Sequence, residues 1–131
     1  MKRETLSILI LEPNILQREL IKMALMRNRM KPTVCSEPAR LREQLIELMP
    51  DVLLVDTYLP GQNGLDLVGQ LNLEILLKRT KVFFISGFGF PEIVQKAAQI
   101  GASGFLVKPL NPDLLVTRIQ SCFDRVGNDP G

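Results

Sequence analysis

Asp56, Ser86 and Lys108 each stand directly after a short apolar run of the 131-residue chain. Such continuous runs are typical of strands that are covered on both faces of a parallel sheet. The carboxyl ends of parallel strands lie at one edge of the sheet, so we expect the three side chains to share a pocket. Phosphoryl transfer can use a carboxylate nucleophile, a hydroxyl donor and an ammonium. The sequence therefore predicts a phosphoryl-handling pocket.

Five apolar runs alternate with five amphipathic stretches along the chain. This alternation predicts a three-layer, doubly wound α/β fold with a parallel sheet between two layers of helices. The length and the apolar content of 46% suit one domain with a single core. The predicted strands are Ser7–Leu11, Thr33–Cys35, Val52–Val55, Val82–Ile85 and Gly104–Val107.

Start signals mark several of the predicted helices. Asn14 is a predicted N-cap with Gln17 at the third helical position, and Asn111 is a cap before a proline at the first helical position. The third helix is predicted to begin near Asn63-Gly64, and residues 73–77, which are mostly apolar, blur its predicted end. The residues predicted to mark one face of each helix are Leu16, Leu20 and Met23; Leu41, Leu45 and Leu48; Leu65, Val68 and Leu71; Val94, Ala97 and Ala98; and Leu115, Ile119 and Cys122.

Composition excludes several kinds of function. The chain contains no His, which removes histidine catalysis and histidine metal ligation. Cys35 and Cys122 match no metal-binding spacing and are predicted to be reduced thiols. The net charge of +2 argues against direct nucleic-acid binding by this domain. The apolar run near the N-terminus is too short to span a membrane, so we expect a cytoplasmic protein with no membrane partner.

Two segments carry a family resemblance, namely Asp56-Thr57-Tyr58-Leu59-Pro60-Gly61-Gln62-Asn63-Gly64 and Gly101-Ala102-Ser103-Gly104-Phe105-Leu106-Val107-Lys108-Pro109. With Ser86 between them, the chain resembles the receiver domain of two-component response regulators from about Leu6 to about Arg125. The resemblance implies a flavodoxin-like sheet of strand order 2-1-3-4-5 with five helices. It implies a receiver domain over residues 1–125 and a C-terminal tail or linker over residues 126–131.

The resemblance also implies the role of each pocket residue. Asp56 would be the phospho-acceptor, Lys108 would neutralise phosphoryl charge, and Ser86 would donate a hydrogen bond to a phosphoryl oxygen. Ser86 and Phe105 would form a switch that reshapes the face made by the fourth helix, fifth strand and fifth helix. The Lys108–Pro109 bond is often cis in the family. The implied donor is a sensor histidine kinase or phosphotransfer protein, and the implied recipient of the signal is a protein partner or output domain on that face.

The acidic pair that follows the first strand in this family departs from its pattern here. The matching residues are Glu12 and Pro13, and proline offers no side-chain oxygen for Mg²⁺. The remaining ligands would be Asp56, Glu12 and the backbone carbonyl of Tyr58. Losing one of three carboxylates changes the pocket charge, including Lys108, from about −2 to about −1. If about 2 kcal/mol of attraction were lost, Mg²⁺ would bind roughly thirtyfold more weakly.

Tyr58 and Phe88 each lie two residues after a predicted pocket side chain. We hypothesise that these rings shield an acyl phosphate from water. Gly87 and Gly89 flank Phe88, so its loop is expected to move easily.

Three other functions compete with a phosphorylated receiver. A degenerate receiver, or pseudo-receiver, would dock proteins independently of phosphorylation. A haloacid-dehalogenase-type phosphatase needs a second Asp two residues after its nucleophile, where this chain has Tyr58. A flavodoxin needs a phosphate-binding loop after the first strand, and residues 12–16 lack the required glycines and hydroxyls. The sequence thus favours a signalling domain over an enzyme.

Overall fold

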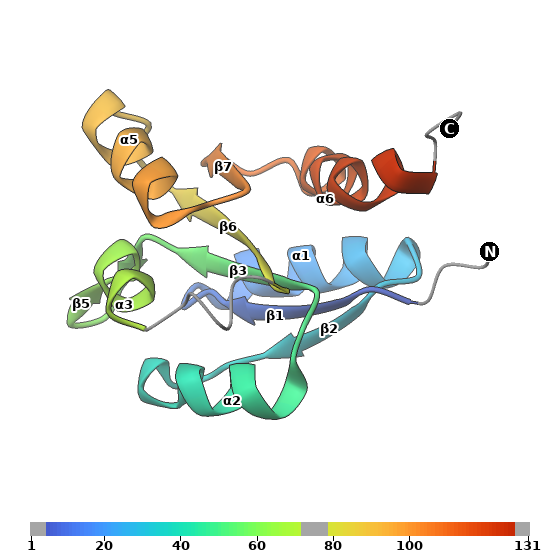
Figure 1. Ribbon diagram of the computed structural model, residues 1–131, viewed down its shortest axis with the longest axis horizontal. Coiled ribbons are helices and arrows are strands. Elements are labelled where there is room, and N and C mark those ends of the chain that lie inside the picture. Colours follow the sequence, from blue (N-terminus) through green and yellow to red (C-terminus); the bar gives the residue numbers. More distant parts are fainter. Residues whose placement is uncertain (1–4, 72–78, 128–131) are drawn as a thin grey trace.

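A computed structural model describes residues 5–71 and 79–127. Its central sheet has five parallel strands in the order β2-β1-β3-β6-β7 (Figure 1). Numbered along the chain without the short hairpin strands β4 and β5, this is the predicted order 2-1-3-4-5. The sheet strands are β1 (Ser7–Leu11), β2 (Lys31–Val34), β3 (Val52–Asp56), β6 (Lys81–Ser86) and β7 (Gly104–Val107).

The described part of the chain contains five α-helices and one 3₁₀ turn. The predicted caps form, since Asn14 accepts the Gln17 N–H and Asn111 accepts the Asp113 N–H. The third helix ends before Leu71, its C-cap, and residues 73–77, which blurred its predicted end, lie outside the described residues. The helices are α1 (Ile15–Arg27), α2 (Leu41–Leu48), α3 (Gly64–Gln70), α5 (Pro91–Ile100) and α6 (Pro112–Gly127), and the 3₁₀ turn is Pro38–Arg40.

Apolar side chains form two cores, one on each face of the sheet. One core joins α1 and α6 to alternate sheet residues such as Ile10, Leu54 and Phe83. The other joins α2, α3 and α5 to the intervening residues, including Leu53 and Phe84. Both faces of every central strand are therefore covered, which explains the continuous apolar runs.

The face of α1 that packs on the sheet is not the predicted one. Ile21, Ala24 and Leu25 are buried, whereas Leu16, Leu20 and Met23 are exposed. The helix carries apolar residues on both sides, so periodicity alone could not choose between them. The small Ala24 side chain allows the helix backbone to approach the sheet. The predicted faces of α2 and α5 are wrong in part, because Leu48, Val94 and Ala98 are exposed.

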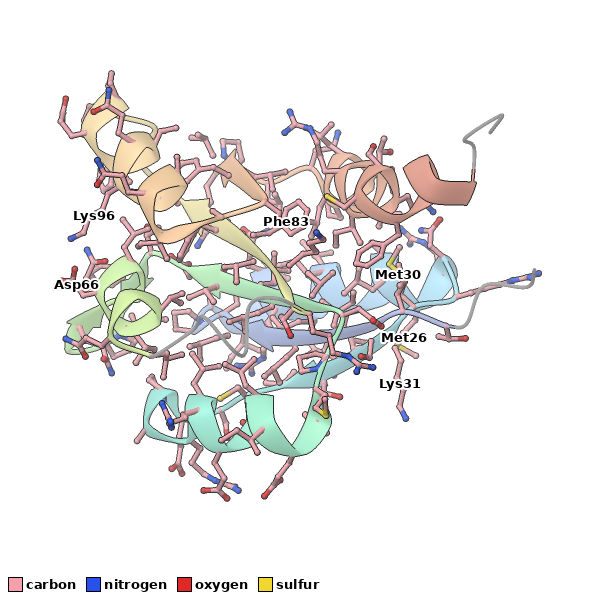
Figure 2. The ribbon with its side chains drawn as sticks, in the orientation of Figure 1. Met26, Met30, Lys31, Asp66, Phe83 and Lys96 are labelled. Carbon is pink, nitrogen blue, oxygen red and sulfur yellow. The ribbon has the colours of Figure 1, made fainter. Side chains whose placement is uncertain are left out.

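An ion pair joins α3 to α5 on the far side of the sheet from α1. Lys96 Nζ lies 2.6 Å from Asp66 Oδ1, and Figure 2 shows the two side chains facing each other between the helices. Both side chains are about half exposed, so the pair contributes little free energy. At the C-terminus, α6 continues to Gly127 and so includes the first two residues of the predicted tail.

A small hairpin separates β3 from α3. Its strands, β4 (Tyr58–Leu59) and β5 (Gln62–Asn63), pair antiparallel around Pro60 and Gly61. Gly61 has a φ of +79°, a left-handed value that favours glycine. The hairpin fixes the chain direction just beyond Asp56.

Candidate functional site

The carboxyl ends of three sheet strands bring Glu12, Asp56 and Lys108 together. Glu12 follows β1, Asp56 ends β3 and Lys108 follows β7. Lys108 Nζ donates a hydrogen bond to Asp56 Oδ2 at 2.5 Å and lies 3.3 Å from Glu12 Oε1. The side chains of Glu12 and Asp56 are 1% and 3% exposed, whereas that of Lys108 is 26% exposed. One ammonium on the solvent side thus faces two buried carboxylates.

This crowding changes the protonation equilibria of the pocket. Burial raises the pKa of the Glu12 carboxyl, the Asn14 N–H lowers it, and the neighbouring Asp56 raises it further. Burial lowers the pKa of the Lys108 ammonium, but the hydrogen bond and charge of Asp56, together with Glu12, raise it above its ordinary value. Lys108 therefore stays charged, and the protonated form of Glu12 is favoured more than in a free glutamate side chain.

The two oxygens of Glu12 have different surroundings. Oε2 accepts the backbone N–H of Asn14 at 3.0 Å, just beyond Pro13. Oε1 is buried and has no hydrogen-bond partner among the described residues, because its approach to Lys108 is not aligned as a hydrogen bond. An orphaned buried oxygen of this kind is a place where a cation or a proton would be stabilised.

Asp56 is held by its own loop as well as by Lys108. Its Oδ1 accepts the Tyr58 N–H at 2.8 Å. The Gly64 N–H donates to the Thr57 carbonyl at 2.7 Å, so the first turn of α3 lies against the carboxyl end of β3. A Cβ at Gly64 would lie 2.0 Å from the Asp56 carbonyl oxygen, which only a glycine avoids.

Ser86 lies at the end of β6, next to β3, but its hydroxyl has other partners. Thr57 Oγ1 donates to Ser86 Oγ at 2.8 Å, and the Phe88 N–H donates to the same oxygen at 3.1 Å. Within the described part of the chain, Ser86 has no hydrogen bond to Asp56. The strand ends therefore bring Ser86 to the same edge of the sheet without joining it directly to the acid.

Comparisons with known proteins identify the family to which this geometry belongs. A family model described as "Response regulator receiver domain" matches residues 8–120. The chain belongs to the response-regulator receiver family. It is 29% identical over 119 residues to the phosphate regulon transcriptional regulatory protein PhoB of Klebsiella pneumoniae, covering 91% of this chain and 52% of that protein. The receiver thus spans about half the length of this relative.

Solved structures share the fold of this receiver. The Vibrio cholerae chemotaxis protein CheY4 matches with a TM-score of 0.81 at 22% identity, covering 90% of this chain and 98% of that chain. The beryllofluoride-activated N-terminal receiver domain of Klebsiella pneumoniae RstA matches with a TM-score of 0.77 at 23% identity, covering 88% and 96%. At these identities the two matches support the fold alone.

The family supplies the general role of the chain. It is a receiver domain of two-component signal transduction, and the match over most of its length does not favour the pseudo-receiver alternative. Such domains are signalling domains and interact with histidine kinases or phosphotransfer proteins and with output domains. They commonly bind Mg²⁺. In residues 5–71 and 79–127, no helix is both long and apolar enough to cross a membrane.

The described pocket offers a cation two buried carboxylates, those of Glu12 and Asp56. The described residues contain no group of three or more His, Cys, Asp or Glu side chains placed to hold a metal. Glu12 and Asp56 are adjacent, and the orphaned Glu12 Oε1 is an oxygen that a cation would satisfy. The residues therefore suit a hydrated divalent ion, which the Glu12 and Asp56 carboxylates would hold.

The structure also locates the predicted switch residue Phe105, the Lys108–Pro109 bond and the two predicted shielding rings, Tyr58 and Phe88. Phe105 lies in β7 and is half-buried against the core that contains Phe84. The Lys108–Pro109 bond is cis. Tyr58 is exposed, and the exposed Phe88 ring stacks on Phe90 with centroids 5.7 Å apart.

Sequence analysis missed two contacts of the pocket, the Asn14 N–H on Glu12 and the Thr57 hydroxyl on Ser86. The contact between Thr57 and Ser86 could have been suspected from the sequence, because Thr57 places a hydroxyl directly after the predicted acceptor Asp56.

Proposed function

We propose that Asp56 accepts a phosphoryl group and that the modified pocket changes the surface offered to a protein partner. The observation that supports this proposal is that the Lys108 ammonium lies between the Asp56 and Glu12 carboxylates and pairs with both. Such a cation beside a buried carboxylate is suited to neutralise a phosphoryl group on that carboxylate. Asp56 is buried but borders a partly exposed lysine, so a donor can approach from the Lys108 side.

The transfer uses the side chains as follows. An Asp56 carboxylate oxygen forms a bond to phosphorus while the phosphorus–nitrogen bond of a donor phosphohistidine breaks, and the imidazole leaves with a proton. Lys108 then moves its hydrogen bond from the carboxylate to a phosphoryl oxygen. Ser86 donates to a second phosphoryl oxygen, which requires its hydroxyl to leave its present partners.

A divalent ion bound at Glu12 and Asp56 would supply additional charge neutralisation for the transfer. We infer that Pro13 lowers the affinity of the pocket for this ion, because water must replace the missing carboxylate ligand. Mg²⁺ accepts water ligands readily but requires near-octahedral geometry. With a loss of about 2 kcal/mol, affinity falls roughly thirtyfold relative to a pocket with three carboxylates.

The proposed output surface is the face formed by α5, β7 and α6. Ser86 is joined to β7 through the Lys108 N–H, which donates to the Ser86 carbonyl at 2.7 Å. Phe105 lies in the same strand, so a movement of Ser86 has a direct route to β7. The face exposes Val94, Val107 and Leu114, which supports a protein partner or output domain as the recipient. We infer that this signalling takes place in the cytoplasm, without direct contact of this domain with nucleic acid or membrane.

Labelling with a small phosphoryl donor tests the proposal. Intact-mass spectrometry with acetyl phosphate and excess Mg²⁺ should show one added phosphoryl group in the native chain and none in Asp56→Asn. Lys108→Met should abolish labelling or slow it by at least about a hundredfold, the factor for about 2.7 kcal/mol. Labelling that persists in Asp56→Asn, or an unchanged rate in Lys108→Met, would contradict the proposal. A Mg²⁺ titration with Pro13→Asp should show a lower half-saturating concentration than the native chain.

A further inference from the structure

The hydroxyl of Thr57 is directed at Ser86 rather than at solvent. Thr57 follows Asp56, and its Oγ1 donates to Ser86 Oγ at 2.8 Å across two neighbouring strands. Thr57 is 7% exposed and Ser86 is fully buried, so water does not compete freely for this hydrogen bond. The contact joins the residue after the acceptor to the hydroxyl proposed to meet the phosphoryl group.

Backbone hydrogen bonds leave the two residues little freedom except at their side chains. The Thr57 N–H donates to the Ile85 carbonyl at 2.8 Å, and the Thr57 carbonyl accepts the Gly64 N–H at 2.7 Å. The Ser86 carbonyl accepts the Lys108 N–H at 2.7 Å. Ser86 can therefore change its contacts mainly by rotation about χ1, a three-state motion.

That rotation has a consequence for Thr57. When Ser86 Oγ turns to a phosphoryl oxygen, it leaves both the Thr57 hydroxyl and the Phe88 N–H, which now donate to it. The buried Thr57 hydroxyl then lacks an acceptor, and a buried donor without an acceptor is unfavourable. The hydrogen bond thus stabilises the unmodified orientation of Ser86 and opposes the modified one.

We propose that Thr57 is a positioning residue whose hydroxyl holds Ser86 in its unmodified orientation and so sets the phosphoryl occupancy needed for switching. This inference rests on the proposed function of Ser86. A valine at this position has a similar shape and lacks the hydroxyl. Thr57→Val should therefore favour the switched state by about five- to tenfold, the effect of one net hydrogen bond. Thr57→Ser retains the hydroxyl and should stay within about twofold of the native chain.

The first measurement concerns the unmodified protein and does not depend on phosphorylation. The χ1 population of Ser86 and the hydrogen exchange of the Phe88 amide are followed by NMR in the native chain, Thr57→Val and Thr57→Ser. We expect one dominant Ser86 rotamer in the native chain and in Thr57→Ser. Thr57→Val should show several rotamers and faster Phe88 exchange. An unchanged Ser86 rotamer in Thr57→Val would overturn the proposal.

The second measurement is a titration with beryllofluoride, a phosphoryl analogue, at saturating Mg²⁺. Thr57→Val should bind about five- to tenfold more tightly than the native chain, and this gain should disappear in a Ser86→Ala background, because Thr57 acts through Ser86. A gain of the same size in that background, or no gain at all, would overturn the proposal. If the native chain binds no beryllofluoride, the proposed function is wrong. The NMR measurement of the Ser86 rotamer still shows, in that case, whether Thr57 holds Ser86 in its unmodified orientation.

Discussion

The substitution Gly64→Ala tests how closely α3 must approach the carboxyl end of β3, beside Asp56. A Cβ at this position would lie 2.0 Å from the carbonyl oxygen of Asp56 and 3.0 Å from the Thr57 Cα. Both atoms belong to the backbone of β3 and the residue after it. The hydrogen bond from the Gly64 N–H to the Thr57 carbonyl holds this backbone close to α3, so it cannot move aside as a side chain would. Relieving the overlap requires a shift of about 1 Å or more, which is larger than the movement produced by a bond-angle distortion of about 15°, itself costing about 4 kcal/mol.

We therefore expect Gly64→Ala to lower the free energy of unfolding by at least about 3 kcal/mol. Gly69→Ala is a matched control in the same helix, since its Cβ would meet only Ile100 side-chain atoms at 3.8 and 3.9 Å. That variant should be unchanged or more stable by up to about 1 kcal/mol, because alanine is the better helix former. Urea denaturation followed by circular dichroism measures both values. A loss below about 1 kcal/mol in Gly64→Ala would show that α3 does not pack as closely against β3 as described.

Three further outcomes follow from the pocket and the core. Folding raises the pKa of Glu12, so above pH 4.5 the folded state binds more protons than the unfolded state. The free energy of unfolding should therefore fall as pH rises through the folded pKa of Glu12. Urea titrations at several pH values should show this fall in the native chain and its loss in Glu12→Gln. Burial raises the pKa of the Cys35 thiol and shields it from reagents. A thiol reagent should therefore modify the half-buried Cys122 first, and it should modify Cys35 only as fast as the protein unfolds. Equal modification rates at the two thiols would contradict the described packing. Tyr58→Ala and Phe88→Ala should each hasten loss of the phosphoryl group from labelled protein, and unchanged rates would remove their proposed shielding role.

The sheet was predictable because its strands are covered on both faces. Continuous apolar runs such as Val52–Val55 mark strands without reference to their neighbours, and the alternation with helices then leaves few topologies. Boundaries of β1 and β7 were predicted to the residue. The edge strand β2 was placed two residues late at its start, because only one side of an edge strand is paired and Pro32 obscures its pattern.

Helix faces and side-chain directions were harder to predict. The exposed Leu16, Leu20 and Met23 form as regular a stripe as the buried residues of α1, so only packing on the sheet distinguishes them. The sequence also left open where the Glu12 carboxylate would point. The structure turns it inward to Lys108, where the Asn14 N–H holds one oxygen and leaves the other unsatisfied.

The most direct test of the account is a crystal structure of the protein with beryllofluoride and Mg²⁺. We expect beryllium bonded to an Asp56 carboxylate oxygen, Lys108 Nζ within hydrogen-bonding distance of a fluorine, and Ser86 Oγ rotated from Thr57 to a second fluorine. Beryllofluoride bound elsewhere, or Lys108 still paired with Asp56 and Glu12 while the analogue is present, would contradict the proposed phosphoryl-accepting pocket.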